Sequence, residues 1–328
     1  MSFSERDLEI DAAAEAERIQ KTIRRQVRGE MRRKGAVLGL SGGVDSSVVA
    51  ALCVRALGPE RVLGLFMPEH HTSDDALTLG RTLAASLGIE TELEDLGPAL
   101  EAIGCYARQR EAIRKVVPDY GPGWKSKITL PSLLEGERLN VFSLVVESPD
   151  GERQTQRLPL DAYLQLVAAT NYKQRLRRTT EYYHADRLHY AVAGTPNRLE
   201  YDQGFFVKQG DGFADFKPIA HLYKTQVYQL ADHLGVPEAI RARTPTTDTY
   251  SLEQTQEEFF FALPLKLMDL SLFAHDRGVP VDEAAPVLGL STEQVERVYR
   301  DIESKRRATR YLHMAPLFVE DPDAPAEA

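Results

Sequence analysis

Residues 38–53, from Leu38 to Cys53, read LGLSGGVDSSVVAALC. An apolar run typical of a buried strand leads into two adjacent glycines, and a helical pattern follows them. Glycines let backbone N–H groups approach an anion closely, and a helix N-terminus adds unpaired donors and the positive end of the helix dipole. The stretch therefore predicts an anion site formed by Ser41, Gly42, Gly43, Asp45, Ser46 and Ser47.

Asp45 indicates which anion binds there. Neither GxxxxGK[ST] nor GxGxxG occurs in the stretch, and no lysine follows the glycines. A carboxylate inside the site would repel a phosphate unless a divalent cation bridges the two, so Asp45 predicts a Mg²⁺-nucleotide. The alternative is an ordinary capped helix after a glycine turn, in which Asp45 interacts only with the helix dipole. The complete S-G-G-x-D-S between strand and helix favours phosphate binding.

The flanking sequence predicts an α/β fold. After one long helix over Asp7–Met31, three strand patterns alternate with two helical patterns: Gly35–Ser41, Asp45–Leu57, 61–68, Asp74–Leu87 and 89–96. Such alternation with short loops predicts a doubly wound parallel sheet between two layers of helices. Residues His189–Gly194 and Ala214–Ile219 are the candidates for strands four and five. The glycine turn then lies at the carboxyl edge of the sheet, where open parallel sheets bind ligands.

The alternation breaks at about residues 118–160, which we interpret as an insertion. Within it, NVFSLVVE and ERQTQRL flank Ser148–Gly151 and predict a β-hairpin. Helical pattern resumes from Leu160 to about Tyr183, and helices continue to the end, around Phe259–Asp276 and Thr292–Arg307. We expect a single domain over residues 1–318 and a flexible acidic tail over 319–328.

Composition narrows the classes of function. The 328-residue chain carries a formal net charge of -9, which argues against a general nucleic-acid binder. Its two cysteines are too few for a disulfide framework or a zinc cluster. No signal pattern opens the chain, and no apolar run approaches the ~20 residues that span a bilayer. We expect a cytoplasmic protein that binds neither nucleic acid nor membranes.

The S-G-G-x-D-S stretch resembles the signature of the PP-loop ATP pyrophosphatases, whose fold is the adenine nucleotide alpha-hydrolase-like one. The resemblance implies cleavage of ATP between the α- and β-phosphates, with the loop holding the pyrophosphate. Members adenylate a substrate oxygen, and a nitrogen or sulfur nucleophile then displaces AMP.

Three further stretches resemble the ammonia-dependent NAD⁺ synthetases. The first, TNYKQRLRRTTEYY, is similar to G-N-x-K-A-R-x-R and matches it at Asn171, Lys173, Arg175 and Arg177. The resemblance assigns Asn171 and Arg175 to the dinucleotide substrate and Arg177 to ATP. Taken alone, the stretch is also compatible with a solvated basic helix face.

The second stretch, AGTPNRLEYDQGFFVKQGDGFADFKPI, follows the family pattern G-T-D-H-A-A-E-x-x-x-G-F-F-T-K-x-G-D-G-x-A-D. Its Glu200 is a carboxylate that can complete a Mg²⁺ site with Asp45. Thr195 ends a strand at the ligand edge and is expected to contact ATP. The candidates for substrate binding are Phe205, Lys208, Asp211 and Asp215. Without the shared register, the Gly-Asp-Gly loop could be only a turn.

The third stretch, LYKTQVYQLADHLG followed by RTPTTDTY, matches the family at Lys224 and Thr246, positions that contact ATP phosphates. Lys224 opens a helix, where a cation is unfavourable next to the dipole and a bound anion would offset that cost. Alone, it could equally be a solvated lysine.

The resemblance implies that nicotinic acid adenine dinucleotide is adenylated and then amidated by ammonia to NAD⁺, with Asp45, Lys208 and Lys224 as catalytic residues. It also implies a homodimer, with free ammonia or a separate glutaminase partner as the nitrogen source. Two departures, Pro196-Asn197 for Asp-His and an absent Asp-Glu-Lys-Pro loop, favour a rival hypothesis: a related amide ligase for a different carboxylate. A sulfur transferase acting on RNA and a non-catalytic nucleotide sensor are two further hypotheses.

Overall fold

The computed structural model describes residues 3–134, 142–247 and 249–320. Its main sheet contains parallel strands in the order β3-β2-β1-β7. They are β1 (Ala36–Gly39), β2 (Val62–Phe66), β3 (Glu90–Leu93) and β7 (Ala191–Val192). Because β1 is central and the chain continues to β2 on one side and to β7 on the other, the strand order reverses beside β1, as in a doubly wound sheet.

The predicted fifth strand is reduced to one parallel bridge between Ala193 and Phe216. The Oδ2 atom of Asp215 accepts the N–H of Val192 at 2.7 Å, so a side chain takes the donor that a strand would use. Pro218 follows closely and has no N–H to extend a ladder. The α/β class is confirmed, with the fifth position held by this bridge.

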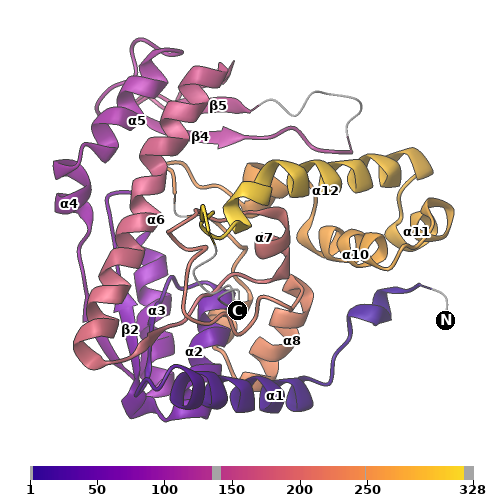
Figure 1. Ribbon diagram of the computed structural model, residues 1–328. Helices are drawn as coiled ribbons and strands as arrows, with labels where there is room; N and C mark the ends of the chain where they lie inside the picture. The colour runs from indigo at the N-terminus through magenta and orange to yellow at the C-terminus, as the bar shows by residue number, and fades with distance from the viewer. Residues whose placement is uncertain (1–2, 135–141, 248, 321–328) are drawn as a thin grey trace.

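Helices cover both faces of the sheet (Figure 1). Ala36 and Leu38 of β1 belong to one apolar core with four helices: α1 (Ala12–Arg24), α2 (Val44–Leu57), α3 (Asp74–Leu87) and α8 (Lys224–Leu234). Val37 points to the opposite face, where it packs with Ala185 of α6 (Leu160–Leu188). The alternation of side chains along β1 thus builds the three predicted layers.

The first predicted helix, Asp7–Met31, is wrong as a single element. The chain forms a 3-10 turn at Glu5–Leu8 and then α1, which begins after Asp11 because that side chain accepts the N–H of Ala14 at 3.0 Å. A π-helical turn, Arg25–Glu30, follows α1. The hydrophobic spacing indicates the buried face but not the capping residue that interrupts the helix.

The insertion contains a second, antiparallel sheet in the order β4-β5-β6. The predicted hairpin is confirmed, since β5 (Ser143–Glu147) pairs with β6 (Arg153–Arg157) through Glu147 and Arg153. Sequence analysis missed β4 (Lys125–Thr129), whose two lysines mask a strand with only Ser126 and Ile128 buried. This sheet packs against the first half of α6 (Figure 1). Helix α6 begins at Leu160 as predicted and continues beyond its predicted end at about Tyr183, as far as Leu188.

The remaining helices lie between and after these parts. They are α4 (Gly97–Ala102), α5 (Cys105–Arg114), α7 (Arg198–Gln203), α9 (Glu238–Arg241), α10 (Leu265–Asp276), α11 (Val281–Leu288) and α12 (Thr292–His313), with a 3-10 turn at Pro59–Arg61 and a π-helical turn at Glu257–Phe261. The predicted helix over Phe259–Asp276 starts only at Leu265, directly after Pro264. Helix α12 continues beyond its predicted end at Arg307, as far as His313.

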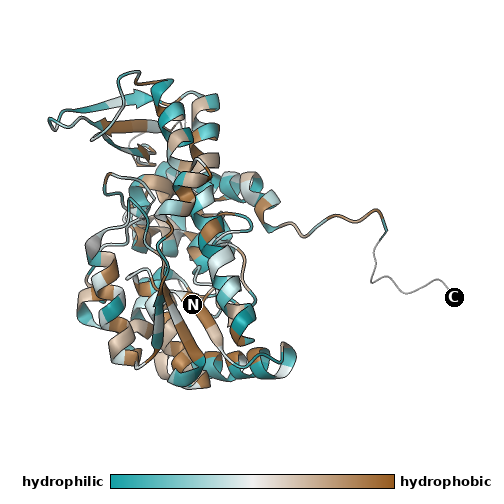
Figure 2. Cartoon of the chain, turned by 90° about the vertical axis from the view of Figure 1, so that its left-hand side faces the viewer, coloured by the Kyte–Doolittle hydropathy of each residue, from teal (hydrophilic) through white to brown (hydrophobic). Residues whose placement is uncertain are grey.

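Residues 314–320, which follow α12, run away from the body of the molecule (Figure 2). Residues 321–328 of the predicted acidic tail lie outside the described residues, and the assignment of 1–318 to one domain stays a prediction. Among the helices that the structure describes, none has the length and apolar character to cross a membrane.

Leu144 offers a test of how firmly the insertion is folded, since it is 0% exposed in the core that joins β5 to α6. We expect Leu144→Ala to lower the free energy of unfolding by about 2–5 kcal/mol, because it removes buried methyl groups and leaves a cavity. Urea denaturation measures the change. The control, Thr155→Ala on the exposed β6, should stay within about 0.5 kcal/mol, and equal effects would contradict the packing described here.

Candidate active site

A cavity of about 570 Å³ opens at the carboxyl ends of the central strands. Gly39 at the end of β1, Phe66 at the end of β2 and Ala193 after β7 all line it. This is the position at which ligands bind in doubly wound sheets, so the cavity lies where the sequence predicts a site.

Most of the predicted site residues meet in this cavity, although they come from distant parts of the chain. The lining includes Ser41, Gly43, Asp45, Ser46, Asn171, Arg177, Thr195, Glu200, Phe205, Asp211, Lys224 and Thr246. The predicted residues outside the lining are Gly42, Ser47, Arg175, Lys208 and Asp215.

The glycine turn is shaped by its own backbone. Gly42 has φ +73°, and a Cβ there would lie 2.5 Å from the carbonyl oxygen of Ala76, so only glycine fits. Gly43 is the N-cap of α2, and its carbonyl accepts the hydroxyls of Ser46 at 3.1 Å and Ser47 at 2.8 Å. Ser47 therefore supports the turn from the buried side. Ser41 and Ser46, with Oγ atoms 3.1 Å apart, remain at the cavity.

Asp45 and Lys224 form an ion pair in the cavity and join the N-terminus of α2 to that of α8. The side chain of Lys224 is only 3% exposed. Burial alone would lower the pKa of Lys224, but the carboxylates of Asp45 and Glu200 outweigh it and raise that pKa. Asp269 accepts the N–H groups of Lys224 at 3.1 Å and Thr225 at 2.7 Å, which caps α8. The positive charge of Lys224 was expected to be unfavourable at this helix start. The carboxylates of Asp45, Glu200 and Asp269 compensate it.

Glu200 lies on the other side of this pair. Burial and the charge of Asp45 raise the pKa of Glu200 to about 8. Gln256 donates to its Oε1 at 2.9 Å, and the N–H of Asn197 donates to its Oε2 at 3.1 Å. The carboxylates of Asp45 and Glu200 repel one another, and a divalent cation bound between them would relieve that repulsion.

The two carboxylates suit Mg²⁺, which binds through one or two protein carboxylates and completes its shell with water and phosphate oxygens. Within residues 3–134, 142–247 and 249–320, no cluster of three or more His, Cys, Asp or Glu side chains could hold a metal. Asp45 and Glu200 would therefore hold Mg²⁺ together with a phosphate ligand rather than as a closed protein cage.

Asn197 is a site residue that sequence analysis missed. The sequence analysis treated Pro196-Asn197 only as a departure from the family pattern. Its Nδ2 donates to Oδ1 of Asp45 at 3.0 Å, and its Oδ1 accepts the N–H of Glu200 at 3.2 Å. Asn197 thus links the two carboxylates from the N-cap of α7. The sequence does carry a signal for it, since Asn followed three residues later by Glu is a capping box.

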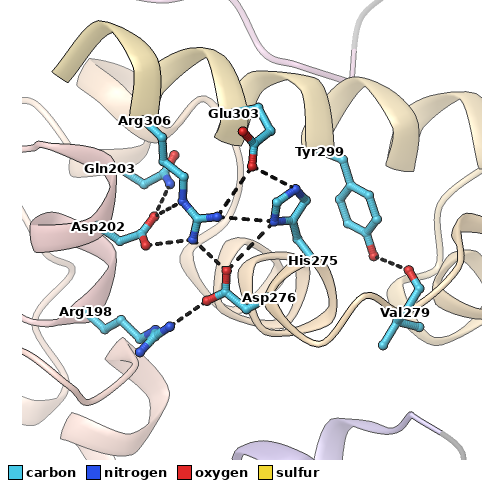
Figure 3. A network of polar contacts seen from close by, with 9 residues as sticks. All are labelled: Arg198, Asp202, Gln203, His275, Asp276, Val279, Tyr299, Glu303 and Arg306. Atoms are coloured by element: carbon cyan, nitrogen blue, oxygen red, sulfur yellow. Dashed lines mark hydrogen bonds and ion pairs between the residues drawn. The ribbon is translucent and has the colours of Figure 1, made fainter. Parts of the chain in front are cut away.

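A network of ion pairs holds α7 through residues that do not themselves line the cavity (Figure 3). Arg306 of α12 bonds both oxygens of Asp202, at 2.9 and 2.7 Å, and Oδ1 of Asp276 at 2.6 Å. Asp276 of α10 also pairs with Arg198 at 2.5 Å. Arg198 and Asp202 flank Glu200 in sequence, so the network fixes the helix that presents Glu200.

Three predicted ligand residues are engaged elsewhere in the protein. Nζ of Lys208 donates to the carbonyls of Tyr311 at 2.9 Å and Met314 at 3.0 Å, at the end of α12. Arg175 donates to the carbonyl of Lys208 at 3.3 Å. Asp215 supports the sheet edge through the N–H of Val192. The roles of these three residues in ligand binding stay predictions.

Comparison with known proteins relates the chain to one family. A family described as NAD synthase matches residues 15–117 and 145–310. An NH(3)-dependent NAD(+) synthetase of Mesorhizobium japonicum is 64% identical over 310 residues, which cover 94% of this chain and 97% of that protein. One from Rhizobium meliloti is 58% identical over 97% of this chain and 95% of its own length.

The chain belongs to the NAD synthase family. The resemblance drawn from the sequence is therefore confirmed. The residues skipped by the family match, 118–144, fall within the predicted insertion and include β4.

The fold of the family is also found here. The solved structure of an NH3-dependent NAD synthetase from Campylobacter jejuni, in complex with the nitrate ion, superposes with a TM-score of 0.61 at 22% identity. The match covers 95% of this chain and 100% of that chain, so the likeness extends over the whole architecture.

Gly42→Ala tests the glycine turn. Alanine would meet the Ala76 carbonyl and adopt a left-handed backbone, so the turn must shift and its N–H groups must move away from the anion. We expect ATP affinity, measured by calorimetry with Mg²⁺ present, to fall at least ~10-fold. The matched control is Gly88→Ala, which has φ +65° and nothing within 4 Å of the new Cβ. It should keep the affinity of the unaltered chain, and an equal loss in both variants would contradict a specific role of Gly42.

Arg306→Met tests the network behind α7. The change leaves Asp202 and Asp276 without their shared guanidinium, so we expect the free energy of unfolding to fall by about 1–3 kcal/mol. Because α7 then holds Glu200 less firmly, the Mg²⁺ concentration needed for half-maximal ATP binding should rise. Arg153→Met, which removes an exposed ion pair on β6, is the control and should change neither quantity appreciably. An unchanged Mg²⁺ requirement in Arg306→Met would show that the network does not support the site.

Proposed function

We propose that this chain is an ammonia-dependent NAD⁺ synthetase, a carbon–nitrogen ligase of NAD biosynthesis. It would convert nicotinic acid adenine dinucleotide, ATP and ammonia into NAD⁺, AMP and pyrophosphate. The observation that carries the proposal is the group formed by Asp45, Asn197, Glu200 and Lys224 beside the glycine turn. The names of relatives that share 58–64% identity with nearly the whole chain support the same reaction.

The first step joins the substrate carboxylate to AMP. A carboxylate oxygen attacks the α-phosphorus, and the bond between that phosphorus and the bridging oxygen breaks as pyrophosphate leaves. The turn formed by Ser41–Ser46 offers hydroxyl and N–H donors to the leaving group. Lys224, protonated because of its carboxylate neighbours, neutralises the charge that develops there. Mg²⁺ held by Asp45 and Glu200 would reduce the repulsion between the phosphates.

The second step forms the amide. Ammonia attacks the acyl carbon of the adenylate, AMP leaves with the bonding electrons, and the nitrogen loses a proton. No covalent intermediate with the protein is needed, since both steps depend on positioning and charge stabilisation. The two cysteines are buried, and burial raises the pKa of Cys53 to about 12 and that of Cys105 to about 11, which suits neither as a nucleophile.

The other predicted site residues keep the roles implied by the family resemblance. Arg177, Thr195 and Thr246 line the cavity and are proposed to bind ATP. The proposed dinucleotide ligands are Asn171, Arg175, Phe205, Lys208, Asp211 and Asp215. Lys208 would have to leave the carbonyls at the end of α12 in order to act on a ligand.

The assembly is proposed by analogy. We expect a homodimer in which Arg175 acts on the dinucleotide of the partner subunit. Free ammonia is the expected nitrogen source, which the NH(3)-dependent names of the relatives support, and a separate glutaminase partner is the second candidate. A cytoplasmic location stays a prediction from the sequence.

The decisive experiment incubates the purified chain with Mg²⁺, ATP, an ammonium salt and nicotinic acid adenine dinucleotide. We expect NAD⁺, AMP and pyrophosphate in equal amounts. Asp45→Asn should lower kcat/KM by about 10²–10³-fold, because it removes a metal ligand and the partner of Lys224. The control is Asp119→Asn, an equal change of charge at an exposed position outside the cavity lining.

The same experiment distinguishes the rival activities. Pyrophosphate release with another carboxylate, but not with the dinucleotide, would overturn the proposal in favour of a related amide ligase. Two results together would favour a nucleotide sensor: the chain binds ATP but forms no product, and Asp45→Asn leaves its biological activity intact.

A further inference from the structure

A buried group of polar side chains lies beside the cavity and takes no part in the roles assigned above. Its centre is Lys173 in the middle of α6, which lines the cavity although only 1% of the residue is exposed. Lysine is almost never fully buried unless its charge is paired. The family resemblance includes this residue without giving it a role.

Every donor of the Lys173 ammonium has a partner. Nζ donates to Oε1 of Glu69 at 3.1 Å, to Nδ1 of His71 at 2.8 Å and to the carbonyl of Thr249 at 2.8 Å. An ammonium has three N–H donors, so none is left for a ligand. Lys173 therefore differs from Lys224, which lines the cavity beside the glycine turn and is proposed to neutralise charge on the phosphates.

The partners on one side are themselves firmly held. Tyr106 of α5 donates to Oε2 of Glu69 at 2.8 Å and stacks on His70 with ring centroids 4.4 Å apart. The N–H of Glu69 donates to the hydroxyl of Thr72 at 3.0 Å. The loop between β2 and α3 is thus fixed at several points.

Burial and the charges of the group act against each other. Burial lowers the pKa of Lys173, and the Glu69 carboxylate opposes that shift without reversing it. Burial would raise the pKa of Glu69, but the charge of Lys173 and the hydrogen bond from Tyr106 help to outweigh it, and the pKa is lowered. Burial and the charge of Lys173 lower the pKa of His71 to about 4. A neutral imidazole can accept the lysine N–H through Nδ1, so the group is one buried ion pair with a neutral acceptor.

The partner on the other side, Thr249, closely follows a loop at residues 243–247. Arg243, Thr246, Thr247 and Thr249 line the cavity from this part of the chain. The contacts that hold the loop include a bridge from Thr246 to Thr255, a hydrogen bond from the N–H of Thr247 to the carbonyl of Gln254 at 2.9 Å, and one from Arg243 to Ser73 at 3.3 Å. Lys173 adds a buried contact that joins Thr249 to Glu69 and His71 in the loop after β2.

We propose that Lys173 is a positioning residue for ATP. By binding the Thr249 carbonyl to Glu69 and His71, it holds the segment that carries Thr246 at the cavity before the nucleotide arrives. Preorganising a binding segment strengthens affinity because less order has to be created on binding. The inference rests on the proposed function only in taking ATP as the nucleotide.

The test uses variants of the full chain and calorimetry with Mg²⁺-ATP. Lys173→Met alone leaves Glu69 as an unpaired buried charge and could prevent folding, so the informative variant is Glu69→Gln with Lys173→Met. We expect ATP to bind at least ~10-fold more weakly, with dinucleotide affinity changed less than ~2-fold. Glu69→Gln alone keeps the bond from Lys173 to Thr249 and should keep ATP affinity within ~2-fold.

A matched control comes from a second buried lysine and carboxylate, Lys305 and Asp301 of α12, whose side chains are 12% and 5% exposed. Asp301→Asn with Lys305→Met should cost stability but leave ATP affinity unchanged. Equal ATP affinity in Glu69→Gln with and without Lys173→Met would overturn the inference. So would an equal loss of ATP affinity in the control.

A measurement on the unaltered chain does not depend on the variants folding. Hydrogen exchange of residues 243–247 should be slow already without ATP, and fast exchange that becomes slow only with ATP would overturn the inference. The proposed function fails separately, if the chain binds Mg²⁺-ATP but forms no NAD⁺. A chain that binds no ATP at all would contradict both.

Discussion

The ion pair between Asp45 and Lys224 is the interaction on which the site depends. It joins the N-termini of α2 and α8, two helix ends whose dipoles favour an anion between them. Asn197 adds the N-terminus of α7 by bonding Asp45 and Glu200. The protein thus brings two carboxylates and a buried lysine together at helix N-termini, where an anion is also favoured.

The rest of the fold holds these helix ends in place. Helix α6 spans both parts of the molecule, since Leu166 packs on the inserted sheet and Ala185 on the main sheet. Lys173 lies between them and connects α6 to the loops around the cavity. Among the C-terminal helices, Arg306 of α12 and Asp276 of α10 hold the helix that presents Glu200 (Figure 3). Helices α6, α10 and α12 therefore support the site through contacts with α7 and with the loops around the cavity.

Sequence patterns succeeded where the chemistry is local. The strand, glycine turn and helix around Asp45 follow from a single stretch, and so does the hairpin of β5 and β6, because turn residues and alternation are local signals. They failed where side chains decide a boundary. Asp11 interrupts the first helix, Asp215 replaces a strand at the sheet edge, and the lysines of β4 hide a strand that buries only Ser126 and Ile128.

The sequence by itself determined the doubly wound fold, the glycine turn between strand and helix, and the family, since each is written in contiguous motifs. It also identified the carboxylates Asp45 and Glu200, because their residue types indicate metal and phosphate chemistry. Only the tertiary structure decided which residues meet: that Asn197 lies between those carboxylates, that Lys208 is bound to the end of α12, and that Lys173 is fully paired. The physical reason is that these partners are chosen by the packing of segments 103 to 152 residues apart, and no local spacing encodes that choice.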